Sequence, residues 1–190
     1  MKEYKVKIEG ITPYMQHRMV DGELEEWEKK RGAIIERGDV AIADKERAEI
    51  CMYKNSKGKP YLPAAHLRGA LINAGGYVKA KVGNAKKSMS NIVAAMFSVS
   101  PDEIELPEDW IVDKQSAVNR NIKARIICIR PKWNKWTAEF NLLIDNDTIT
   151  DATIKEILQY AGQYVGIGSF TPRHKGMYGR FKTTTFERIE

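Results

Sequence analysis

The sequence has 190 residues, a net charge of +6 and 43% hydrophobic residues, a composition typical of globular proteins. It contains no apolar run of membrane-spanning length, and its first ten residues alternate like a strand instead of forming the apolar core of a signal peptide. The two cysteines, Cys51 and Cys128, are far apart and are expected to be reduced and packed, as in the cytosol. These features predict one cytoplasmic domain covering residues 1–190.

The predicted elements begin with a strand at residues 3–9, in which Tyr4, Val6 and Ile8 share one face. An acidic, exposed helix is expected at 21–30, followed by an irregular excursion over the surface at 31–47. Residues 48–63 then read as a hairpin that turns at 55–58.

Three amphipathic helices are predicted from apolar residues spaced i, i+3, i+4 and i+7. The first follows Pro63 and ends at Gly75 and Gly76, the second begins near Lys86, and the third follows Thr150 as its N-cap. Strands are expected near 102–106, 111–113, 122–130, 136–144 and 180–189. These helices are too few for a doubly wound parallel sheet. The order therefore predicts an α+β fold with a ferredoxin-like (RRM-like) core, an antiparallel sheet, helices on one face and long insertions.

Basic residues gather in three segments that contain no acid, at 79–87, 114–135 and 173–182, and together these hold 15 of the 31 lysines and arginines. Such segregation favours a positive face that meets a polyanion, although lysines also solubilise exposed loops. Trp133 lies among cations and could stack on unpaired bases, whereas Trp136 is expected to cover the core. The candidate nucleic-acid contacts in the first two segments are Lys79, Lys81, Lys86, Lys87, Arg120, Lys123, Arg125, Arg130 and Trp133.

The stretch YVGIGSFTPRHKGMYGRF, residues 164–181, combines four glycines with three permanent cations and a histidine. Glycine lets backbone amides approach a ligand closely, so the stretch is interpreted as a phosphate-contacting loop, with a simple turn as the alternative. It is not a P-loop, because it runs from helix into strand and lacks the Gly-Lys-Ser/Thr ending. The candidate contacts here are Gly166, Gly168, Arg173, His174, Lys175, Gly176, Gly179 and Arg180.

A second candidate is YLPAAHLRGALINAG, residues 61–75, where a helix begins and its free amides attract anions. Arg68 is interpreted as a phosphate clamp, while His66 is more readily a structural histidine than a catalyst. The sequence contains no recognised spacing of metal ligands, no cofactor motif and no activated nucleophile. The residues therefore give little support for an enzymatic activity.

Two of these stretches resemble the RAMP superfamily, the backbone and processing proteins of CRISPR effectors. YLPAAHLRGAL is similar to its proline-led helix start, and GIGSFTPRHKGMYGRF is similar to its C-terminal glycine-rich loop; EGITPYMQHR resembles its first strand and loop. The chain also resembles a group of bacteriophage and prophage proteins. The RAMP resemblance implies an RRM-like fold that binds single-stranded nucleic acid, often as a side-by-side oligomer. By their positions in the resembling segments, Arg68 would contact the backbone of the nucleic acid, and the four glycines would form the loop that binds it.

The leading hypothesis is a non-catalytic protein that binds single-stranded DNA or RNA and assembles as a homo-oligomer along the strand. One alternative is a metal-independent RNA endonuclease that uses His66 or His174 as general base or acid. The other is a non-enzymatic assembly protein whose basic face meets an acidic protein partner.

Overall fold

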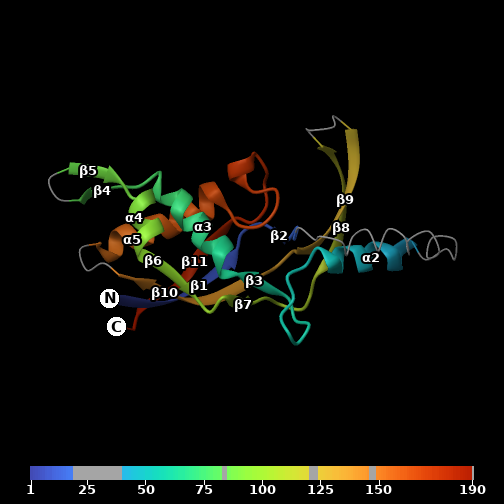
Figure 1. Cartoon of the computed structure of the whole chain (residues 1–190), viewed down its shortest axis with the longest axis horizontal. Helices are drawn as coiled ribbons and strands as arrows, with labels where there is room; N and C mark the ends of the chain where they lie inside the picture. The colour runs from blue at the N-terminus through green and yellow to red at the C-terminus, as the bar shows by residue number, and fades with distance from the viewer. Residues whose placement is uncertain (19–39, 83–84, 120–123, 146–148, 190) are drawn as a thin grey trace.

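The computed structural model describes residues 1–18, 40–82, 85–119, 124–145 and 149–189 (Figure 1). The strands are β1 Lys2–Gly10, β2 Tyr14–Met15, β3 Tyr61–Pro63, β4 Lys79–Val82, β5 Ala85–Ser88, β6 Phe97–Ser100, β7 Glu103–Glu105, β8 Ile111–Asn119, β9 Ala124–Trp133, β10 Thr137–Ile144 and β11 Phe181–Arg188. The α-helices are α2 Val40–Ile50, α3 Ala64–Gly75, α4 Ser90–Met96 and α5 Asp151–Tyr160; η1 Ala161–Val165 is a π-helix and η2 Pro172–His174 a 3₁₀-helix.

The main sheet has four strands in the order β11-β1-β10-β6, and every neighbouring pair is antiparallel. Along the chain these strands alternate with two helices as β1-α3-β6-β10-α5-β11. The last strand therefore lies beside the first, and the third lies between the first and the second, which is the ferredoxin-like arrangement. The α+β, ferredoxin-like prediction is confirmed.

The core forms where the apolar face of this sheet meets α3 and α5 (Figure 1). In β1, Tyr4, Val6 and Ile8 are fully buried, as the alternation of the sequence predicts. The hydroxyl of Thr150 accepts the amide of Thr153 at 3.3 Å, which confirms the predicted N-cap of α5. Among the described helices, none is long and apolar enough to cross a membrane.

A second sheet, in the order β2-β9-β8, contains the long β8–β9 hairpin that rises away from the main sheet (Figure 1). Three buried rings join the two sheets, because the centroid of Tyr14 lies 5.5 Å from that of Trp133 and 5.4 Å from that of Trp136. The chain therefore crosses from one sheet to the other between β9 and β10, over a shared aromatic contact.

Several elements differ from the sequence prediction. Residues 40–47 belong to α2 and not to an excursion, while the expected helix at 21–30 lies outside the described residues. The second helix begins at Ser90 instead of near Lys86, because residues 85–88 pair with β4. The expected hairpin at 48–63 is reduced to one bridge, Lys54 to Pro60, since β3 pairs with β7. Strand β6 was not expected, because four residues directly after a helix carry too short a pattern.

The burial of Trp133 leads to a stability prediction. Trp133→Ala removes a ring that is 0% exposed and an indole N–H that donates to the carbonyl of Pro107 at 2.7 Å. We expect the free energy of unfolding, measured with urea, to fall by about 3–5 kcal/mol. Ile127→Ala on the same strand is the control, because Ile127 is 53% exposed and the change should stay within about 0.5 kcal/mol. Similar losses for the two variants would contradict the buried position of Trp133.

Candidate nucleic-acid interface

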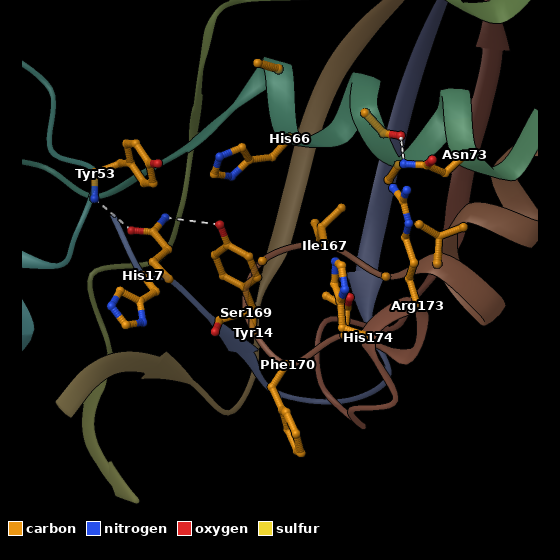
Figure 2. Close-up of a pocket in the computed structure, with 18 of the residues that line it drawn as sticks. Tyr14, His17, Tyr53, His66, Asn73, Ile167, Ser169, Phe170, Arg173 and His174 are labelled. Carbon is orange, nitrogen blue, oxygen red and sulfur yellow. Dashed lines mark hydrogen bonds between the residues drawn. The ribbon is translucent and has the colours of Figure 1, made fainter. Parts of the chain in front are cut away.

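A groove of about 640 Å³ lies between α3 and the segment Gly166–Arg180, which we call the glycine loop (Figure 2). All three histidines of the chain, His17, His66 and His174, line it, although they are far apart in the sequence. Arg130 and Arg173 line it as well, and none of the described residues of its wall is an aspartate or glutamate. The groove is therefore a concave, cation-rich site without a carboxylate.

His66 lies in the first turn of α3, and its side chain extends from the helix toward Tyr53 (Figure 2). Its ring meets that of Tyr53 edge-on at 5.1 Å, and burial lowers its pKa. Its Nδ1 is buried and has no hydrogen-bond partner among the described residues. Burial also lowers the pKa of His17, with Arg130 and Arg47 adding to the effect. Both imidazoles are thus neutral near pH 7, and a phosphate beside them would favour their charged form.

Arg130 connects the β8–β9 hairpin to the glycine loop. Its Nη1 donates to the hydroxyl of Ser169 at 3.0 Å, and its Nη2 lies 3.6 Å from Asp113. Asp113 also accepts from Lys132 at 3.0 Å, so one buried carboxylate serves two cations. This leaves net positive charge behind the groove wall, held in place by the loop.

The glycine loop is held against the segment Ile11–Gln16. The amide of Ser169 donates to the carbonyl of Met15 at 2.9 Å, and the amide of Gly179 donates to that of Pro13 at 2.7 Å. Gly168 has a φ of +86° and a Cβ there would lie 2.3 Å from the Met15 oxygen. At Gly179, with φ +72°, a Cβ would lie 1.8 Å from the oxygen of Ile167. Close packing of backbone on backbone therefore requires these glycines.

The amides of the loop serve the fold more than a ligand. Those of Gly166, Gly176 and Gly179 donate to carbonyls of this chain, at 2.8, 2.8 and 2.7 Å. The expectation that these glycines would present amides to a phosphate is corrected, because their donors are already used.

Phe170 is a residue that the sequence reasoning missed. It has a φ of +57°, which is strained for a bulky side chain, and it is 45% exposed. Its ring points away from α3 at the outer rim of the groove (Figure 2). Phe170 therefore presents an exposed aromatic ring at the rim of the groove, whereas the sequence analysis had expected such a ring at Trp133. The prediction that Trp133 stacks on bases is wrong, because Trp133 is buried in the core. The sequence feature that could have pointed to Phe170 is its position within the glycine loop.

The structure brings together only some of the predicted contacts. Arg130, Gly166, Gly168, Arg173 and His174 line the groove, as does His66. Lys175 is exposed on the loop but does not line the groove, and neither do Gly176, Gly179 and Arg180. The lysines of 79–87 are exposed on β4 and β5, outside the groove: Lys79, Lys81, Lys86 and Lys87. Arg120, Lys123 and the side chain of Arg125 lie outside the described part of the chain.

Arg68 does not contact the groove, and its role as a phosphate clamp is corrected. Its Nε donates to the carbonyl of Phe97 at 3.0 Å, and its Nη2 donates to the carbonyl of Ala94. The guanidinium therefore satisfies carbonyls where α4 ends and β6 begins, and it fixes α3 to them.

Within the described ranges, no group of three or more His, Cys, Asp or Glu side chains is arranged to hold a metal ion. The three histidines that line the groove therefore do not form such a group either.

No protein-family model and no curated protein matches this sequence. The fold is similar to that of a chain in the cryo-EM structure of the Type III-B Cmr-beta bound to cognate target RNA. The two share 13% identity with a TM-score of 0.54, and the alignment covers 100% of this chain and 61% of that chain. This chain therefore spans about three fifths of the length of the solved chain, and at this identity the likeness concerns the fold alone.

The contacts of Arg68 generate a prediction that separates stability from binding. Arg68→Ala leaves two carbonyls without their charged donor, so the free energy of unfolding should fall by about 1–3 kcal/mol. Any affinity that the wild type shows for single-stranded nucleic acid should be kept by the folded variant, as judged by fluorescence anisotropy well below the unfolding midpoint. Arg173→Ala, which removes an exposed side chain, should leave stability unchanged. Loss of affinity in Arg68→Ala without loss of stability would restore the clamp assignment.

Proposed function

We propose that this chain binds single-stranded nucleic acid in the groove between α3 and the glycine loop. The observation that carries the proposal is the convergence of Arg130, Arg173 and the three histidines on one groove without a carboxylate. Cationic side chains that line a concave surface bind the phosphate backbone by releasing its counterions.

Two further features support a single strand as the ligand. Phe170 offers an exposed ring at the rim, and unpaired bases of any sequence can stack on such a ring. The first turn of α3 faces the groove through Ala65 and His66, and its N-cap, Pro63, makes no side-chain hydrogen bond to it. Helix starts of this kind attract phosphate groups.

The likeness in fold to a Cmr-beta chain solved with target RNA agrees with this proposal. We propose from the sequence resemblance that the chain is a RAMP-like protein, and the likeness in fold supports this proposal. As an extension we propose that copies assemble side by side along the strand. The resemblance to bacteriophage proteins stays a prediction.

The role of Arg173 is tested by Arg173→Ala. Loss of a phosphate contact should weaken binding to all sequences about equally, by about 1 kcal/mol or roughly fivefold. It should also reduce the slope of log K against log salt by about one. The measurement is anisotropy of labelled oligo(dT) and oligo(U) between about 50 and 200 mM salt. Lys57→Ala is the matched control, since Lys57 is an exposed cation outside the groove. Equal behaviour of the two variants would refute the phosphate contact.

Metal-independent RNA cleavage is a second candidate, favoured by the three histidines in one groove. A neutral imidazole would take the proton of a 2′-hydroxyl, whose oxygen would attack the adjacent phosphorus. The bond from phosphorus to the 5′ oxygen would break, and an imidazolium would protonate that oxygen. Low pKa values of His66 and His17 suit the role of base.

Labelled RNA incubated with excess EDTA tests this candidate. Cleavage should leave 2′,3′-cyclic phosphate ends, and His66→Gln or His174→Gln should abolish it while binding persists. DNA of the same sequence, which lacks the 2′-hydroxyl, is the control substrate. RNA that stays intact with the wild-type protein would remove the candidate and leave the binding proposal in place.

A further inference from the structure

Three tyrosines from separate elements form an exposed aromatic patch. Tyr77 follows α3, Tyr160 ends α5, and Tyr164 lies in η1. Their ring centroids are 5.9, 5.3 and 6.1 Å apart, with interplanar angles of 2°, 29° and 28°. All three pairs of rings are stacked, and the nearly equal separations place the three centroids at the corners of a triangle. Tyr160 packs partly buried against the core, whereas Tyr77 and Tyr164 are 58% and 53% exposed and face solvent.

This tyrosine patch adjoins the groove at one end. Tyr164 directly precedes Val165 and Gly166, which line the groove. On the other side Asn73 lines the groove, and Tyr77 lies four residues further on, just past the end of α3, where its amide donates a hydrogen bond to the carbonyl of Ala74 at 2.9 Å. The elements that carry the patch are therefore the same ones that line this end of the groove, although the three tyrosines do not line it themselves.

Beyond the patch lies the β4–β5 hairpin, which extends from the helical layer (Figure 1). It begins two residues after Tyr77, and its described residues carry four exposed lysines and no acid: Lys79, Lys81, Lys86 and Lys87. The lysines of the β4–β5 hairpin therefore lie next to the tyrosine patch in the chain, and the patch lies next to residues that line the groove.

We propose that the tyrosine patch and the β4–β5 hairpin form a second contact for the same single strand, so that the binding track runs from the groove over Tyr164 and Tyr77 to the lysines. Unpaired bases would stack on the exposed rings, and the lysines would neutralise the phosphates between them. This inference rests on the proposed function. It assigns a ligand to residues 79–87, the basic segment whose lysines lie outside the groove.

The composition around the rings favours nucleic acid over a protein partner. Lysine is depleted in protein–protein interfaces, whereas here four lysines border the patch. Stacking on a ring is tolerant of sequence, because every base has a π-face. A strand that leaves the groove at this end meets rings first and cations next.

The test compares two lengths of oligo(dT) and of oligo(U): the shortest that the wild type binds measurably, and one of about 16 nucleotides. The double variant Tyr77→Ala/Tyr164→Ala should bind the short one as the wild type does and bind the long one about tenfold or more weakly. The matched variant Tyr77→Phe/Tyr164→Phe keeps the rings and should keep both affinities. Replacing the four hairpin lysines with alanine should lower the salt slope for the long oligonucleotide only.

Arg173→Ala, measured in parallel, separates this inference from the proposed function. If Arg173→Ala weakens both lengths while the tyrosine variant weakens neither, the track is wrong and the groove assignment stands. If the wild type binds neither length, both fail. If the alanine variant changes the mass of the protein in light scattering without nucleic acid and leaves long-oligonucleotide affinity intact, the patch is a contact between copies, and the inference is overturned.

Discussion

The segment Ile11–Gln16 is the constraint on which the rest of the structure depends. On one side it pairs with β9, with Tyr14 opposite Trp133. On the other it accepts the amides of the glycine loop, at the carbonyls of Pro13 and Met15. Gln16 ties in a third part, because its side chain accepts the amide of Tyr53 at 2.9 Å. The segment Ile11–Gln16 therefore holds three parts of the structure together: the β8–β9 hairpin, the glycine loop and the chain that precedes α3. The groove lies between these parts.

The electrostatic character of the groove follows from this packing more than from the net charge of +6. Arg130 is held at the wall by Ser169, and its carboxylate partner lies behind it on β8. Burial lowers the pKa of His66, and burial together with Arg130 and Arg47 lowers the pKa of His17. The fold thus places its acids elsewhere and gathers groups that are cationic, or become cationic when an anion arrives.

Periodicity was sufficient to predict the ferredoxin-like core, because the apolar residues of β1, α3 and α5 each repeat with the period of their element. The proline-led helix start and the glycine loop were predicted as two separate candidate sites, and only the folded structure brings residues of both onto one groove. The roles of Arg68 and Trp133 could not be predicted, since both depend on carbonyls supplied by distant segments, at Phe97 and Pro107. The convergence of the three histidines has no signal in their spacing either, because tertiary pairing alone brings them together.

Internal hydrogen bonds order much of the glycine loop before any ligand arrives. The amides of Gly166, Ser169, Gly176 and Gly179 all donate to carbonyls of this chain. A loop that is ordered in advance has little conformational entropy left to lose, so an occupant of the groove would meet a surface whose shape is already set.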